Sequence, residues 1–129
     1  MSHYAKVNVT EIEDSAPKFG MDQVQEARFA RAALGCEAIG LTYYKVKPGQ
    51  RLGFGHHHDE IEETYLVLGG SGRFKIDDEI VEVVPRDAVY VPPQAVREWE
   101  AGDDGLEMVA FGAHADSEQG HMQPGWWTD

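Results

Sequence analysis

Three adjacent histidines, His56, His57 and His58, precede an acidic segment and are the residues of this sequence best suited to bind a metal. Side chains on a β-strand alternate between its two faces, so His56 and His58 point the same way while His57 points opposite. Neutral imidazole is a good ligand for divalent Fe, Mn, Ni, Zn or Cu, and two at i and i+2 need only one strand. Glu63, on the next predicted strand, supplies a carboxylate. Two histidines and one carboxylate leave coordination positions open, as in non-haem Fe(II) sites.

β-Strands have to position these side chains, because a solvated turn or a tag remnant would equally explain a bare run of histidines. Ala38–Val46 is rich in apolar, aromatic and β-branched residues and is ended by Pro48-Gly49. Further short strands are predicted at Glu63–Leu68, Arg73–Ile76, Ile80–Val84, Ala88–Val91, Val96–Glu100 and Leu106–Phe111, with a hairpin turn at Asp77-Asp78-Glu79. Many short strands separated by turns predict an all-β sandwich or barrel rather than alternating β and α elements.

The two ends of the chain are less regular. A short strand is predicted at Lys6–Val9 and a helix at Asp22–Leu34, where Asp22 could be the N-cap. The apolar residues of this helix do not form one stripe, so an irregular or extended arm is the alternative. The tail Ala115–Asp129 has no periodicity, but Trp126-Trp127 is too apolar to lie wholly in water and is expected to pack across the barrel.

Length and charge restrict the class of protein. The 129 residues suit one domain, and the formal net charge of −12, from 11 basic and 23 acidic residues, repels phosphate backbones and anionic headgroups. We therefore expect neither nucleic acid nor a membrane as a partner. The chain has no apolar run of about 18 residues and no signal pattern. Its single cysteine, Cys36, excludes an internal disulfide, so a cytoplasmic location is expected.

The segment around the histidines resembles the first motif of the cupin family. Gly49 is followed by six residues, then by His56, His58, four residues, Glu63, six residues and Gly70. Fifteen residues separate Gly70 from Arg86, and Arg86–Pro93 is similar to the second cupin motif. The resemblance spans roughly Tyr43 to Phe111.

This resemblance implies a fold and an assembly. The fold would be all-β, a cupin-type double-stranded β-helix or jelly-roll barrel, over residues 1–129. We expect an N-terminal arm or short helix at 1–36, the barrel at 37–113 and a C-terminal tail at 114–129. The resemblance to small cupins also implies a dimer formed through N-terminal strands. A homodimer is therefore expected, with Ala38–Tyr44 and the arm at the interface.

The second motif departs from the family pattern at Arg97, where the motif would supply a third histidine. Arginine stays protonated and has no lone pair to offer a metal. A unit charge about 5 Å from a divalent ion costs roughly 6 to 7 kcal/mol at an effective dielectric of about 20. Arg97 therefore turns outward, is neutralised by a carboxylate such as Glu98, Glu60 or Glu107, or lies in the cavity and binds an anionic ligand.

Other side chains are assigned by strand parity and motif position. Tyr65 shares parity with Glu63, so it should line the same cavity, as a wall residue or as a proton donor. His57 should lie at the rim. His114 and His121 fall outside the motif positions and are interpreted as loop histidines, without an assigned role.

Two functions remain open on this evidence. The first is a metal-dependent enzyme acting on a small molecule, either neutral or anionic, with dioxygenase or isomerase chemistry implied by the resemblance. The metal would be held by His56, His58 and Glu63, and Arg97 and Tyr65 would contact the substrate. The second is a non-catalytic cupin whose barrel holds a small anionic or sugar-like ligand, with or without metal, and in which Arg97 holds an anion. Fold alone does not decide between them.

Overall fold

The computed structural model describes residues 3–115 and 119–129. Two 3₁₀ helices, Val9–Glu11 and Ala16–Phe19, and one short α-helix, α1 (Arg31–Leu34), lie near the N-terminus. The strands are β1 (Gln25–Phe29), β2 (Ile39–Val46), β3 (Phe54–His58), β4 (Glu63–Ile76), β5 (Glu79–Val83), β6 (Ala88–Val91), β7 (Arg97–Ala113) and β8 (Gly120–Pro124). Of the helices described, none is long and apolar enough to cross a membrane.

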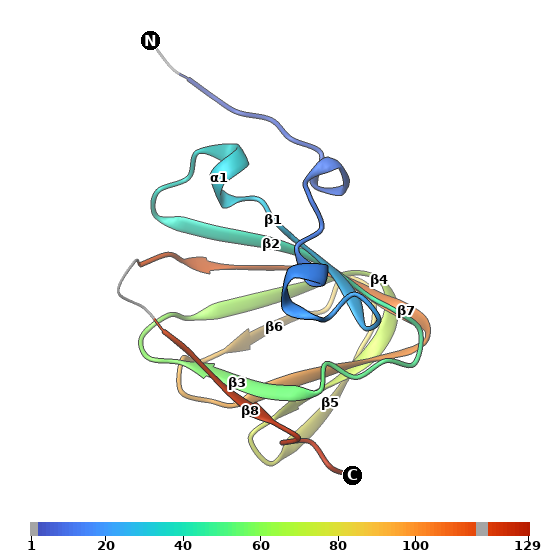
Figure 1. Ribbon diagram of the computed structural model, residues 1–129. Coiled ribbons are helices and arrows are strands. Elements are labelled where there is room, and N and C mark those ends of the chain that lie inside the picture. The colour runs from blue at the N-terminus through green and yellow to red at the C-terminus, as the bar shows by residue number, and fades with distance from the viewer. Residues whose placement is uncertain (1–2, 116–118) are drawn as a thin grey trace.

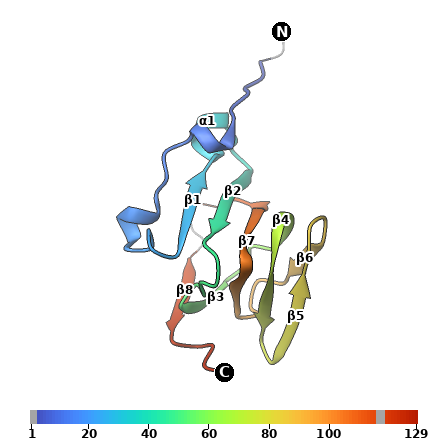
Figure 2. The ribbon, with the colours of Figure 1, turned by 90° about the vertical axis from the view of Figure 1, so that its right-hand side faces the viewer.

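The described strands form one eight-stranded antiparallel sheet that curls on itself (Figures 1 and 2). Its main path runs β1-β2-β7-β3-β8, and β4 pairs with β7, β5 and β6. β4 and β7 pair from Glu63↔Gly112 to Ile76↔Arg97 and bridge the two halves of the barrel. In Figure 1, β1 and β2 lie at the top of the barrel and β3 and β8 at the bottom. This arrangement confirms the predicted all-β jelly-roll fold.

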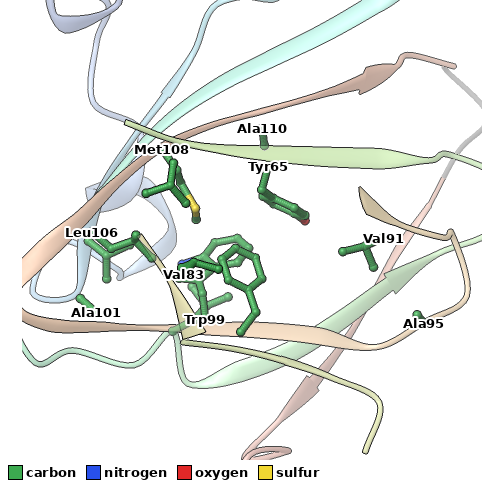
Figure 3. Close-up of a cluster of buried hydrophobic side chains, with 13 residues drawn as sticks. Tyr65, Val83, Val91, Ala95, Trp99, Ala101, Leu106, Met108 and Ala110 are labelled. Carbon is green, nitrogen blue, oxygen red and sulfur yellow. The ribbon is translucent and has the colours of Figure 1, made fainter. Parts of the chain in front are cut away.

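Aromatic and aliphatic side chains fill the interior of the barrel (Figure 3). Trp99 is 2% exposed, and its ring centroid lies 5.6 Å from that of Tyr65 and 5.9 Å from that of Phe74. Burying side chains of this size stabilises a fold by about 1.5–3 kcal/mol each. The ring of Trp99 also lies 5.8 Å from the ring of His56, so the packed core directly supports the histidine strand.

The helix expected over Asp22–Leu34 is wrong, because most of its central part is strand β1 and only α1 is helical. All five residues of β1 pair with β2. Gln25 and Ala27 are buried, two residues apart, which is the period of a strand. The hydrogen bonds and the buried face offered by β2 outweigh the helical preference of this segment. The alternative of an extended arm is therefore the one that the structure shows.

The strand expected at Lys6–Val9 is also wrong. This segment is irregular up to Val9, which begins a 3₁₀ helix. Asn8 is the N-cap of that helix, and its Oδ1 accepts a hydrogen bond from the backbone N of Thr10 at 3.0 Å. A side chain that caps a helical turn locally competes with the extended backbone of a strand.

The strands predicted for the barrel are confirmed, but two pairs of them are single long strands. Residues 63–68 and 73–76 both belong to β4, and residues 96–100 and 106–111 fall almost entirely within β7. Register shifts between Val67 and Gly69 and between Gly70 and Gly72 absorb the glycine-rich segment. Such β-bulges bend a strand without ending its pairing, which is why turn-like residues did not mark a true turn.

The C-terminal tail packs against the barrel, as predicted, and also contributes strand β8. All five residues of β8 pair with β3, so the tail supports the strand that carries the histidines. Trp127 is 4% exposed and lies beneath Arg51, whose guanidinium carbon is 4.1 Å from the ring centroid. Trp126 packs on Gly55, where a Cβ would lie 2.6 Å from its ring. Strands β1 and β8 thus join the sheet from outside residues 37–113.

Candidate metal centre

Strands β3 and β4 bring the predicted ligands together inside the barrel. His56 and His58 lie on one face of β3, with ring centroids 5.3 Å apart and side chains 15% and 17% exposed. β8 pairs with one edge of β3, and β7 pairs with the other at His56↔Arg97. Glu63 is the first residue of β4, and its side chain is 21% exposed. His56 and His58 therefore lie on the same face of the strand, as the alternation of side chains predicts.

The potential ligand atoms converge on one point. Nε2 of His58 lies 3.2 Å and Nε2 of His56 lies 3.8 Å from Oε1 of Glu63. One ligand atom from each of these residues lies within 4.8 Å of the other two. Atoms that share one ion at bond lengths of about 2.0–2.2 Å are roughly 3–4 Å apart. The Nε2 atoms of both histidines lie at such distances from the Glu63 oxygen, so the three side chains form a candidate site for a divalent ion.

Burial and hydrogen bonding favour the protonation states that bind metals. Burial lowers the pKa of His56 below its ordinary value, although Glu63 opposes that shift. Burial alone would raise the pKa of Glu63, but hydrogen bonds with His56, His58 and Tyr65 outweigh it and hold that pKa well below its usual range. A neutral imidazole and an ionised carboxylate are the ligand forms that coordinate a cation.

The donor set fits a divalent Fe, Mn, Ni, Zn or Cu ion held by three protein ligands. The hydroxyl of Tyr65 donates to Glu63 Oε1 at 2.6 Å and orients the carboxylate, as outer-shell residues do in metal sites. Nδ1 of His56, by contrast, is buried without a hydrogen-bond partner in the part of the chain that the structure describes. The residues present therefore fit a metal, with less outer support for His56 than for Glu63.

Arg97 turns inward and is fully buried, so the outward orientation is wrong. Its Nη1 donates to Oε1 of Glu63 at 3.2 Å, and its Nη2 donates to the carbonyl of Pro92 at 2.8 Å. The carboxylate that pairs with Arg97 is thus the predicted metal ligand, which was not among the three expected partners. Glu98, one of those three, instead accepts a hydrogen bond from the backbone N of Gly53 at 2.8 Å.

Tyr65 lies on the same face of β4 as Glu63, as the alternation of side chains along a strand predicts. Its ring packs in the core and its hydroxyl reaches the site. Tyr65 is 1% exposed, and its ring centroid lies 5.2 Å from that of Phe74. Burial, followed by the negative charge of Glu63, raises the pKa of Tyr65 well above its ordinary value. The phenol is therefore protonated at neutral pH, and its proton is directed at Glu63.

His57, His114 and His121 lie outside this cluster. His57 faces away and stacks on His121, with ring centroids 4.8 Å apart and an interplanar angle of 20°. Nε2 of His121 lies 2.8 Å from Oδ1 of Asp59. His114 follows the end of β7, and its backbone N donates to the carbonyl of Ala38. Within the described residues, none of these three joins a group of metal-ligating side chains.

A cavity of about 230 Å³ opens beside His56, and part of its wall was not predicted from the sequence. Gln25 and Met122 line it, one from β1 and one from β8. Gln25 fell inside the predicted helix and Met122 inside an aperiodic tail. No local pattern could have placed them together, because their strands come from opposite ends of the chain. The other lining residues are Tyr44, Leu52, Phe54, His56, Trp99 and Gly120.

A curled antiparallel barrel with two histidines and one carboxylate in its interior defines a small β-barrel protein with a candidate metal centre. The family model described as "Cupin domain" matches residues 42–112, which is more than half of the chain. The protein therefore belongs to the cupin family, and the resemblance found in its motifs is confirmed. No curated protein matches the sequence.

Solved structures share this fold at low sequence identity. A cupin protein from Bacteroides fragilis is 22% identical, with a TM-score of 0.70 over 94% of this chain and 92% of that chain. A sugar phosphate isomerase from a cupin superfamily, from Silicibacter pomeroyi, is 20% identical, with a TM-score of 0.73 over 90% and 80%. The polyketide cyclase RemF from Streptomyces resistomycificus is 17% identical, with a TM-score of 0.74 over 100% and 89%. At these identities the likeness establishes the fold alone.

Proposed function

We propose that this protein is a divalent-metal-dependent enzyme that acts on a small molecule inside the barrel, with isomerase-like or dioxygenase-like chemistry. The observation that carries the proposal is the convergence of His56, His58 and Glu63, whose ligand atoms lie within 4.8 Å of one another. Structural neighbours that are named as a sugar phosphate isomerase and a polyketide cyclase agree with small-molecule chemistry on this fold. Three protein ligands leave positions on the ion for substrate oxygens.

Each residue of the site has a defined task in this proposal. His56, His58 and Glu63 would hold the metal, which when bound supplies a Lewis acid. Tyr65 and Arg97 donate to Glu63 Oε1 and hold its carboxylate in one orientation. Tyr65 is also the nearest protonated phenol to the ligands, so it stays our candidate for proton donation and substrate contact.

Arg97 supports a second candidate function, a non-catalytic cupin that binds a small ligand without metal. Its charge lies against Glu63, where it opposes a cation at the same carboxylate. Arg97 would then be the substrate-binding residue for an anion. Both Nη groups already donate to protein acceptors, Glu63 and the Pro92 carbonyl, so an anion would have to displace one of them. This cost favours the metal-dependent proposal.

We also propose that the protein is a homodimer. An apolar row crosses the outer face of the sheet through the paired residues Leu41, Phe111, Thr64 and Tyr90. Phe111 and Tyr90 are 40% and 53% exposed. Leu41 of this row belongs to the segment Ala38–Tyr44 that the sequence marks as an interface. Light scattering is expected to give twice the chain mass of 14.4 kDa, and a mass of 14.4 kDa at micromolar concentration would contradict the dimer.

The partners and the cellular location of the protein stay predictions that rest on its composition. The net charge of −12 argues against nucleic acid and anionic membranes as partners. The single cysteine favours a cytoplasmic location.

Elemental analysis of protein purified without an affinity tag or chelator tests the proposed function. Plasma mass spectrometry should find close to one equivalent of Fe, Mn, Ni, Zn or Cu per chain. Protein that contains none of these metals and takes none up on titration would reject the metal-dependent enzyme. The metal-free ligand-binding function would then be the one to pursue.

A further inference from the structure

The barrel is open along one side. β1 and β8 are the two ends of the main strand path, and no backbone pairing joins them in the described chain. A groove of about 480 Å³ runs between these strands and the 3₁₀ helix Ala16–Phe19. We call it the apolar groove. Its wall is formed mainly by the side chains of Phe19, Met21, Phe29, Phe54 and Met122.

The apolar groove leads to the candidate metal centre. Four residues line both the groove and the 230 Å³ cavity beside His56, namely Gln25, Tyr44, Phe54 and Met122. Phe54 is two residues before His56 on the same face of β3, and their ring centroids are 6.2 Å apart. A molecule in the groove can therefore extend to the face of β3 that carries the ligands.

The lining of the groove selects against charge. No Asp, Glu, Lys or Arg lines either cavity in the part of the chain that the structure describes. The cation of the neighbouring site, Arg97, is already paired with Glu63 and the Pro92 carbonyl. A phosphate or carboxylate that entered this groove would lose its hydration without gaining a partner. Aromatic rings and thioethers instead favour flat, apolar molecules.

Gln25 supplies one oriented polar group within this apolar lining. The residue is 5% exposed, and its Oε1 accepts a hydrogen bond from the indole Nε1 of Trp99 at 3.1 Å. This bond fixes which side of the amide is the acceptor, because the indole can only donate. Nε2 of Gln25 donates to no acceptor among the described residues. This nitrogen is not among the buried polar atoms that lack a partner, so it is open to the cavity that Gln25 lines, where a ligand oxygen can accept from it.

From these observations we propose that the apolar groove binds a neutral, flat, predominantly apolar molecule that bears a carbonyl or hydroxyl oxygen. The aromatic part lies against Phe54 and Met122, and the oxygen accepts a hydrogen bond from Gln25. That this molecule is the substrate rests on the proposed function, whereas its binding to the groove does not. A sugar phosphate, which is highly hydroxylated and doubly charged, does not suit this lining.

Binding measurements with defined probes test the proposal. 2-Acetonaphthone is a neutral naphthalene with one carbonyl, and 2-ethylnaphthalene has the same shape without the acceptor. Isothermal titration calorimetry on the full chain should show the ketone binding about three- to tenfold more tightly, the effect of one neutral hydrogen bond. Glucose 6-phosphate, the charged comparison, should not bind measurably. Tight binding of glucose 6-phosphate with no binding of either naphthalene would overturn the proposal.

Three substitutions locate the bound ketone. Met122→Glu and Phe19→Glu place a charge on the rim of the groove, where the side chains are 66% and 67% exposed, so the fold should tolerate both. Each should weaken ketone binding at least about tenfold. Val84→Glu, at a 54% exposed position outside the groove, is the matched control and should leave binding unchanged. Gln25→Leu should remove the preference for the ketone over the hydrocarbon.

The outcomes separate this inference from the proposed function. Unchanged ketone affinity in both rim variants would place the probe elsewhere and reject the groove. A halved mass of Met122→Glu in light scattering, with unchanged ketone binding, would show that a second copy of the chain covers the groove, which also rejects it. In a further outcome, the protein takes up no metal while substitutions at Gln25 and Met122 still change ketone binding as expected. That result would support the groove as a binding site and reject the metal-dependent enzyme.

Discussion

Nη1 of Arg97 lies 3.2 Å from Oε1 of Glu63, the same oxygen that faces the Nε2 atoms of His56 and His58. Arg97 lies directly opposite His56 in the β3–β7 pairing, at the position where the cupin motif would supply a third histidine. The chain therefore has a carboxylate clamped by an arginine in place of a fourth ligand. Because removing one partner of a buried ion pair costs about 3–5 kcal/mol, Arg97 also supports the fold.

Removing any one of the three ligands should release the metal and leave the barrel folded. His56→Ala and His58→Ala each delete one donor from a cavity inside an existing core. Glu63→Gln removes the carboxylate charge but keeps an acceptor for Arg97, whose buried guanidinium would be left unpaired by alanine. His57→Ala is the matched control, because His57 faces away and stacks on His121. Metal content measured by plasma mass spectrometry should fall in the first three variants only. Retention of metal by all three would reject the ligand assignment, and circular dichroism checks that each variant is folded.

Arg97→His should tighten metal binding by at least about tenfold, because it removes a positive charge and adds a fourth ligand. Arg97→Leu, which removes the charge and adds no ligand, separates these two effects. Competition titration with a chelator of known affinity gives the dissociation constant for each protein. If Arg97→His binds no better than Arg97→Leu, the side chain at position 97 does not reach the ion.

Tyr65→Phe should weaken metal binding by about tenfold, because the hydroxyl that orients Glu63 is lost. The ring remains, so the core packing against Trp99 and Phe74 is kept. Tyr90→Phe is the control: its hydroxyl donates to Glu62 at 2.5 Å on the outer face, away from the site. Equal metal affinity in the two variants would show that Tyr65 does not position the carboxylate.

Arg86→Gly should raise the free energy of unfolding by about 1 kcal/mol, because the backbone of Arg86 has φ 77°, which favours glycine. Asp77→Gly is the comparison at a similar angle, φ 50°. There the Oδ1 of Asp77 accepts a hydrogen bond from Val96 N at 2.9 Å, so the substitution should give no gain. Urea titration measures both. A destabilised Arg86→Gly would show that the arginine side chain contributes more than its backbone angle costs.

Local patterns in the sequence were sufficient to predict the barrel strands and the grouping of His56, His58 and Glu63, whereas metal binding by these three residues stays a prediction. The alternation of residues along a strand placed His56 and His58 on one face, and the cupin-like spacing added Glu63. Parity also placed Tyr65 on that face. These predictions succeeded because each depends on residues that are close in the chain and on a backbone period that the sequence displays directly.

Contacts between distant segments were decided only by the tertiary structure. The segment at Gln25 has helical propensity, yet it became a strand because the edge of β2 offered a complete set of partners. Arg97 had three carboxylates nearby in the predicted fold, and the packing of β7 against β3 and β4 selected Glu63 instead. The groove between β1 and β8 unites residues almost 100 positions apart in the chain, Gln25 and Met122. The periodicity of the sequence cannot predict such pairs, because the two residues become neighbours only when the sheet closes.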